Sequence, residues 1–423
     1  MRVPFAIGCG CLFAACSAPS AEQVNDTETE DSNVLLDTDS GTVAVDTDLT
    51  DTDIVDTNLD TDMDTDVDTD VAWVDPCVDW STGVCEIADV GLELIPVATP
   101  GANGLTVHPT TGDVYLVLNG ADFWCSGQPD GDATYAETLS IIDGSTATEV
   151  ANVPTDPGPV WPIVDVARDR VYVAASGAGG TIVAHDPATG SALETWNLGG
   201  RPHDMGLDVQ GSTMVVSNTY DMSQTYVSVW DLDDEVELSH PAVPGLPHKI
   251  VVDDDERVAY VVSLGAGEIT AIDLVTGQVV DTLSSGDIPQ TSGMVFSPSR
   301  RILYVGKTAG TTPEEGNTLV AVDVDTGQIV GTTGTFLPNV STPTRPWQMA
   351  LDDETGLLYA ALANSSSVIV VNVDTMTPVG LIEVDTCPWA VVLDVDRGYG
   401  YVSHNEAATV ARFDLDKVTS ALE

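Results

Sequence analysis

The chain has 423 residues, of which 67 are acidic and 13 are basic, so its formal net charge is −54 at pH 7. Such a charge excludes a simple electrostatic affinity for nucleic acid, which requires a basic face, and it disfavours docking on anionic lipid. What it favours is solubility, self-repulsion and attraction for cations.

Residues 1–15 form the first predicted element, a leader. A single base, Arg2, precedes an apolar run that ends at Ala15, which is typical of a secretory signal and too short for a membrane-spanning helix. The sequence Phe13-Ala14-Ala15-Cys16 resembles the lipobox of bacterial lipoproteins, which implies lipidation of Cys16; ordinary signal cleavage is the alternative. By resemblance to Gram-negative lipoproteins, Ser17 implies export to the outer membrane or cell surface.

Residues 16–75 form an acidic tether with repeated Asp-Thr-Asp motifs and no aromatic residue before Trp73. A segment with so little apolar surface cannot offset its ordering entropy, so it is predicted to be disordered and extended by charge repulsion. Alternating aspartates also allow weak calcium binding. The glycine and the distal acid that an EF-type loop needs are not regularly placed, so an acidic spacer is the favoured interpretation.

Residues 76–90 are predicted to form a small cysteine-containing collar. Removal of the leader before Cys16 leaves four cysteines in an exported chain, which suggests two disulfides with three possible connectivities. We favour a local Cys77–Cys85 bond, which leaves Cys125 and Cys387, from the first and last repeats, to close the ring. Four unpaired thiols are the alternative.

Residues 91–423 repeat one pattern. In residues 246–287, four runs rich in Val, Ile, Thr and Tyr are separated by Gly, Asp and Ser, which is the chemistry of strands and hairpins. The pattern occurs in seven units of about 40–58 residues, and such a period indicates a repeat architecture. We therefore predict an all-β fold, a seven-bladed β-propeller of four-stranded antiparallel blades, because a closed ring covers both faces of every blade.

Each third strand ends on an acid or amide, and several continue as Asp-x-x-Thr-Gly, in which the Asp side chain can bond the turn backbone and Gly supplies a positive φ. These residues are Asp143, Asp186, Asp231, Asp273, Asp323, Asn372 and Asp414.

The last unit, 386–423, contains three clear strands and a weak end. Residues 91–99 read as an outermost strand and are predicted to complete the last blade, so that both termini close the ring. The alternative is that residues 418–423 fill that place.

Two insertions, 120–138 and 308–317, lie between the second and third strands of blades 1 and 5. Equivalent loops lie on one face of a propeller, and inserted loops are where binding surfaces usually form.

A recurrent Pro-x pair marks the entry to the innermost strands. Pro fixes φ where the chain turns inward, so the neighbouring residue is expected to point at the mouth of the central channel. The predicted ring consists of Asn103, Trp161, His203, His248, Gln290, Trp347 and Trp389.

This ring has two interpretations. His203 and His248 could hold a small ligand between walls formed by Trp347 and Trp389, or the ring could be a structural plug that bonds loop carbonyls. Imidazole suits transition metals, but two histidines without a third obvious ligand fall short of a zinc signature, so no metal is assigned.

The repeat resembles the YVTN β-propeller family over about residues 91–423, with its Pro-His entry, Tyr-Val strand and Asp-x-x-Thr-Gly turn. Strands such as VYVAAS and VYLVLN depart from the family tetrad. The resemblance implies an exported or surface propeller. Related quinoprotein propellers carry a Trp four residues after the Gly, where this chain has Glu194 and Asp281.

These features predict a membrane-anchored, exported propeller that acts as a non-catalytic binding or scaffold module through one loop face. The protein is expected to be a monomer. Its partner is an unknown protein or small molecule, with no nucleic acid, no cofactor and no catalytic residue assigned. The alternative is a lactonase-like or oxidoreductase propeller that uses the channel mouth. Neither a G-x-S-x-G elbow nor a phosphate-binding G-x-x-x-x-G-K motif occurs.

Overall fold

The computed structural model describes residues 84–119, 125, 137–177, 179–210, 212–218, 225–264, 266–283, 288, 291–307, 317–337 and 344–423. All of them belong to one compact unit, Asp70–Glu423. The leader, the tether, Cys77 and most of both insertions lie outside the described residues. Within the described part, none of the helices is long and apolar enough to cross a membrane.

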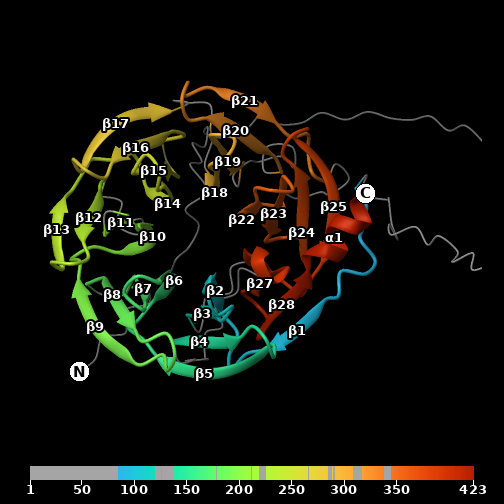
Figure 1. The fold of residues 1–423 in the computed structure, drawn as a ribbon, viewed down its shortest axis with the longest axis horizontal. Coiled ribbons are helices and arrows are strands. Elements are labelled where there is room, and N and C mark those ends of the chain that lie inside the picture. The colour runs from blue at the N-terminus through green and yellow to red at the C-terminus, as the bar shows by residue number, and fades with distance from the viewer. Residues whose placement is uncertain are drawn as a thin grey trace, which may run out of the picture. The chain divides into compact units, whose positions relative to one another are not determined.

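The described chain forms seven four-stranded antiparallel sheets, which Figure 1 shows as blades around a ring. Val, Ile, Leu and Tyr dominate the middle strands of each blade, because both faces of these strands pack against neighbouring blades. The prediction of an all-β, seven-bladed β-propeller is confirmed.

From the innermost strand outward, blade 1 consists of β2 (Ala102–Val107), β3 (Val114–Leu118), β4 (Thr138–Asp143) and β5 (Thr148–Pro154). Blade 2 consists of β6 (Pro159–Asp165), β7 (Arg170–Ala175), β8 (Thr181–His185) and β9 (Ala192–Asn197). Blade 3 consists of β10 (Pro202–Asp208), β11 (Thr213–Asn218), β12 (Val227–Asp231) and β13 (Val236–Ser239), and blade 4 of β14 (Pro247–Asp253), β15 (Val258–Ser263), β16 (Ile269–Asp273) and β17 (Gln278–Leu283).

In the same order, blade 5 consists of β18 (Thr291–Ser297), β19 (Ile302–Lys307), β20 (Leu319–Asp323) and β21 (Ile329–Thr332). Blade 6 consists of β22 (Pro346–Asp352), β23 (Leu357–Leu362), β24 (Ser367–Asn372) and β25 (Thr377–Glu383). Blade 7 consists of β26 (Pro388–Asp394), β27 (Tyr399–His404), β28 (Thr409–Asp414) and β1 (Glu93–Pro96). A 3₁₀ turn, η1 (Val395–Arg397), and one helix, α1 (Leu415–Leu422), complete the described elements.

The last blade is closed by both ends of the described chain. Strand β1 pairs antiparallel with β28, with Ile95 opposite Val410, as predicted for residues 91–99. The alternative, in which residues 418–423 form that strand, is wrong because residues 418–422 belong to α1. Asp414 accepts a hydrogen bond from the Lys417 backbone N–H, so the acid that ends the last third strand caps a helix instead of a hairpin.

The core consists of apolar clusters between neighbouring blades. The tyrosines of the repeated second strands are buried in it, among them Tyr115, Tyr359 and Tyr401. The Tyr115 hydroxyl donates to the Pro187 carbonyl of the next blade at 2.9 Å, which satisfies its polar end. The repeated tyrosine is therefore a packing residue, and Tyr115 also joins adjacent blades.

The collar residues 84–90 attach to blade 6. Glu86 forms a parallel bridge with Leu381 of β25, and the Leu381 N–H donates to the Cys85 carbonyl at 2.7 Å. Ile87 and Val90 pack in the cluster that contains Phe413 and Val418. The collar thus covers an outer edge that would otherwise expose unpaired backbone groups.

The propeller has two faces. The turn face carries the connections between first and second and between third and fourth strands, such as residues 254–257 and 274–277. The loop face carries the other connections, such as residues 240–246 and 266–268. On the turn face the predicted Asx turns are confirmed: the Asp273 carboxylate accepts from the backbone N–H groups of Val275 and Thr276 at 2.9 and 2.7 Å.

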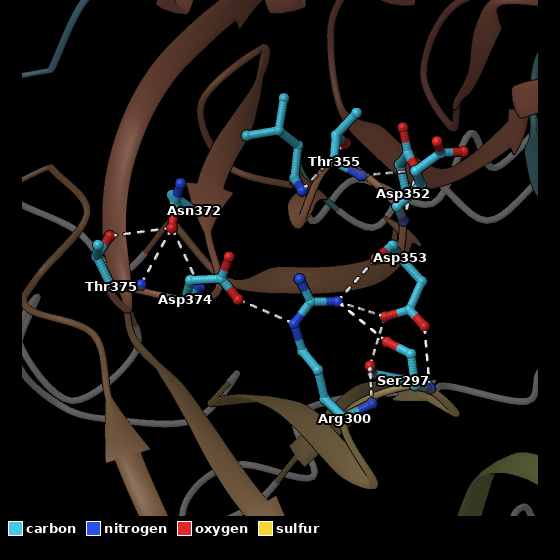
Figure 2. Close-up of polar contacts among 11 residues, drawn as sticks. Ser297, Arg300, Asp352, Asp353, Thr355, Asn372, Asp374 and Thr375 are labelled. Carbon is cyan, nitrogen blue, oxygen red and sulfur yellow. Dashed lines mark hydrogen bonds and ion pairs between the residues drawn. The ribbon is translucent and has the colours of Figure 1, made fainter.

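Arginines join the blades on the turn face. Figure 2 shows Arg300 of blade 5, whose Nη1 donates to the Asp353 carboxylate and carbonyl of blade 6, both at 2.7 Å. Its Nε donates to Asp374 at 2.9 Å. Arg257 likewise bonds buried Asp208 of the preceding blade at 2.8 Å. In this acidic chain, scarce positive charge is used to hold neighbouring blades together.

Candidate functional site

The innermost strands share one irregularity at the loop face. In all seven, the pairing register shifts directly after the first residue of the strand. Such a β-bulge inserts one extra residue and re-aims its side chain. We call the seven residues that follow the first residue of each innermost strand the mouth; they are Asn103, Val160, His203, His248, Ser292, Trp347 and Trp389.

Five of the seven residues predicted to form the ring occupy mouth positions: Asn103, His203, His248, Trp347 and Trp389.

The position predicted for Trp161 is wrong by one residue. Strand β6 begins at Pro159, so Val160 takes the mouth position and Trp161 pairs with Ala174 in the regular ladder. Pro162 is tolerated inside β6 because the innermost strand is a sheet edge, where a missing N–H costs no ladder bond. Gln290 lies outside the described residues, and the register of β18 assigns its expected place to Ser292.

Four mouth rings contact one another in sequence. The ring centroids are 3.9 Å apart for His203 and His248, 6.0 Å for His248 and Trp347, and 4.6 Å for Trp347 and Trp389. His248 belongs to blade 4 and Trp347 to blade 6, which are not neighbours in the ring. Their edge contact therefore shows that the side chains of separate blades converge on a narrow mouth.

A buried ion pair lies next to these rings. Lys249 Nζ is 3.2 Å from an Asp204 carboxylate oxygen, and the Ile250 N–H donates to the other oxygen at 2.7 Å. The same Nζ lies 4.2 Å from the Trp161 ring centroid, in cation–π geometry. Lys249 of blade 4 thus reaches across blade 3 to blade 2, and burial raises the pKa of Asp204 even though Lys249 and Ile250 lower it.

Burial also controls the charge of His203. It lowers the pKa of His203 well below its usual value, and the neighbouring His248 and Lys249 lower it further. Desolvation disfavours the charged imidazolium in such a place. His203 is therefore neutral at neutral pH, and its ring packs against His248 without charge repulsion.

Two serines at the end of second strands hold the bulges in place, and sequence reasoning missed them. Ser217 Oγ accepts from the Asp204 N–H at 3.0 Å and donates to the His248 carbonyl of the next blade at 2.7 Å. Ser403 makes the same pair of contacts to Ala390 and Asn103. The signal in the sequence is a Ser one residue before the polar end of the strand, in MVVSN and YVSHN.

Buried polar atoms that lack a partner gather at the same end of the second strands. In the part of the chain that the structure describes, neither side-chain atom of Asn218 has a hydrogen-bond partner, although the residue is only 1% exposed. Asn119 Oδ1, Ser263 Oγ and His404 Nε2 share this condition. Because buried polar groups are normally paired, such atoms are expected to bond ordered water or a bound ligand.

The Cys125–Cys387 disulfide predicted from sequence is confirmed. Its Cα atoms are 6.0 Å apart, and it ties the blade 1 insertion to the entry of β26, beside Trp389 and Trp347. Cys85 is also disulfide-bonded. Cys77, the partner predicted for it, lies outside the described residues.

The described residues contain one group with ligand atoms close enough for a metal, formed by Cys125, Cys387 and Glu406 within 4.8 Å. Both sulfurs are engaged in the disulfide, so they offer no thiolate to a metal. A pocket of about 410 Å³ lies elsewhere, along residues 86–92 and Glu383, and it contains no mouth residue.

No protein-family model matches the chain, and no curated protein matches its sequence. Among solved structures, a chain of hydrazine synthase from Kuenenia stuttgartiensis is similar, with a TM-score of 0.61 and 15% sequence identity; the match covers 75% of this chain and 97% of that one. Because 1690 chains match this fold, likeness alone selects no activity. What the comparisons and the geometry establish together is a seven-bladed β-propeller fold.

Proposed function

We propose that this protein is an exported, lipid-anchored β-propeller that binds a protein or small-molecule partner through its loop face, with the mouth at the centre of the site. The observation that carries the proposal is the convergence of His203, His248, Trp347 and Trp389 at bulged positions of four blades. Such a cluster offers rigid aromatic surface with few polar groups, which is the usual composition of a binding site.

Several unpaired polar atoms lie at the loop face, which supports that face as the binding surface. Asn218, Ser263 and Asn119 carry such atoms at the loop-face ends of strands, within the described residues. On the turn face, acids at the ends of innermost strands are engaged. Asp165, for example, accepts from Arg168, and Asp352 accepts from Glu354. The loop face therefore offers polar groups that can bond water or a bound partner.

A lactonase-like or oxidoreductase activity at the mouth is the second candidate. The observation in its favour is a buried carboxyl, Asp204, directly after buried His203 in the sequence. Against it, both Asp204 oxygens are already held, by Lys249 and by the Ile250 N–H. A carboxylate engaged in this way is poorly placed as a general base, so binding is the function that the geometry favours.

The sequence and the disulfide support export and anchoring. Phe13-Ala14-Ala15-Cys16 resembles a lipobox, and a disulfide between Cys125 and Cys387 suits an oxidising compartment. We place the domain at the outer membrane or cell surface, as a monomer of the YVTN type. In this proposal residues 1–15 are the signal, 16–75 an acidic tether with at most weak Ca²⁺ binding, 76–90 the collar and 91–423 the propeller, with no resident cofactor.

The test compares two Trp→Ala variants in cross-linking on intact membranes. Trp347→Ala removes a half-buried mouth ring, and Trp196→Ala removes a half-buried ring between blades 2 and 3, away from the mouth. We expect Trp347→Ala to abolish a specific cross-linked adduct that Trp196→Ala retains. An adduct that survives Trp347→Ala, or that both variants lose equally, would contradict the assignment of the mouth.

A further inference from the structure

We infer that the mouth binds a small organic anion, in which a carboxylate is joined to a planar body. This inference rests on the proposed function, since it names the ligand class of the same site. It comes from the positions of the positive charges and from the rings beside them.

The basic residues of the propeller divide into two sets. Arg2 lies in the leader, and the other twelve of the 13 bases lie between residues 168 and 417. Eight of the twelve bind carboxylates or backbone carbonyls away from the mouth; they are Arg168, Arg170, Arg257, Arg300, Arg301, Arg397, Arg412 and Lys417. The remaining four, Arg201, Lys249, Lys307 and Arg345, all adjoin the mouth.

These four cations come from consecutive blades, 3 to 6. Arg201 and Arg345 directly precede Pro202 and Pro346, the first residues of β10 and β22. Lys307 pairs with the first residue of β18, and Lys249 follows mouth residue His248. Because the rings of blades 4 and 6 touch, the entries of these strands surround a narrow opening, and one ligand can lie within reach of several of the cations.

The local balance of charge at the mouth differs from that of the whole chain. Among the described residues, Arg201 and Lys307 form no ion pair with a carboxylate, and both side chains are half-buried. Two described acids of the loop face are engaged by other groups, Glu137 by the Gly158 N–H and Asp156 by the Thr181 hydroxyl. Screening limits charge effects to about 8 Å at physiological ionic strength, so a ligand at the mouth responds mainly to the charges beside it, such as Arg201 and Lys307.

The aromatic residues favour a planar ligand. Trp347 is half-buried, so part of its ring is open to solvent, and it packs against Trp389 with a 38° angle between the rings. A planar ligand can extend this aromatic surface while its carboxylate meets Arg201 or Lys307 in a charge-assisted hydrogen bond. The two features together select an aromatic or conjugated carboxylate over a neutral planar molecule.

The test uses the full chain and two probes of the same shape, indole-3-acetate and its neutral amide, indole-3-acetamide, with binding measured by calorimetry. We expect the acetate to bind about tenfold more tightly, an advantage that added salt reduces. The double variant Arg201→Gln/Lys307→Gln should bring the two affinities close to equal. Arg170→Gln, which removes a base that bonds only backbone carbonyls on the turn face, should leave the preference unchanged.

Three results would overturn the inference: equal affinities in the unmodified protein, a preference that persists in the double variant, or no binding of either probe at millimolar concentration. If the unmodified protein binds both probes equally and Trp347→Ala abolishes that binding, the mouth is still a binding site but has no preference for anions. The failure of the anion inference can therefore be distinguished from failure of the proposed function.

Discussion

The arginine bridge between blades 5 and 6 allows a quantitative test of what holds the ring together. Arg300→Met keeps the apolar stem of a side chain that is 24% exposed and removes its guanidinium. The loss includes two 2.7 Å hydrogen bonds to Asp353 and one at 2.9 Å to Asp374. Asp374 is 62% exposed, so its ion pair contributes little. The expected effect thus comes mainly from the two bonds to Asp353.

The Asp353 carboxylate does not lose all its partners in this variant. Burial alone would raise the pKa of Asp353, but hydrogen bonds from Ser297, Ser299 and Arg300 outweigh it and hold the pKa below its usual value. After the substitution Ser297 and the Ser299 N–H still donate to it. Because no bare buried charge remains, we expect a loss of about 2 kcal/mol in the free energy of unfolding.

The assay is urea unfolding followed by circular dichroism, with Arg170→Met as the matched control. The Arg170 guanidinium bonds only the carbonyls of Arg168 and Asp169 in its own turn, so its loss should cost less than about 0.5 kcal/mol. High salt should narrow the difference between Arg300→Met and the unmodified protein only slightly, because the Asp353 contacts are partly buried. Equal midpoints for Arg300→Met and Arg170→Met would refute the argument that arginines staple the blades.

Three further predictions concern the mouth and its surroundings. Replacing Cys125 and Cys387 by Ser should lower the free energy of unfolding by about 2–5 kcal/mol, because the bond constrains 262 residues of the unfolded chain; an unchanged urea midpoint would contradict this. Burial lowers the pKa of His203 in the folded protein. The stability that depends on neutral His203 is therefore fully present above about pH 6.5, and it is lost as the pH falls, because the unfolded chain takes up the proton first. The variant His203→Phe should therefore lose less stability than the unmodified protein between pH 7 and pH 5, and parallel pH curves would argue against the assignment. Gly104→Ala would place a Cβ 2.4 Å from the Trp161 ring, so it should cost about 1–3 kcal/mol and alter tryptophan fluorescence, whereas Gly334→Ala, with no atom within 4 Å, should do neither.

The sequence by itself determined the number of blades, their strand content and the turn chemistry. These properties are local: alternating β-branched residues form strands, and an Asp at the end of a third strand bonds the next two N–H groups, as Asp273 does. A pattern repeated seven times then permits few architectures, which is why closure by residues 91–99 could be predicted as well.

The sequence also pointed to most of the mouth, because Pro precedes His203, His248, Trp347 and Trp389 at equivalent places in the repeat. It misplaced Trp161 by one residue. Pro162 imitates the entry signal, and only the pairing of Pro159 with Ala175 reveals where β6 begins. A one-residue change in register reverses the direction of a side chain, so a local motif could not settle the matter.

The tertiary structure alone decided which mouth residues meet. Asp204 and Lys249 are 45 residues apart, and the His248 ring meets Trp347 from a blade that is not its neighbour. These contacts depend on the diameter of the ring and on the bulge that re-aims each side chain, and no spacing along the chain encodes either quantity. Local chemistry thus specifies each blade, whereas the site exists only where seven blades converge.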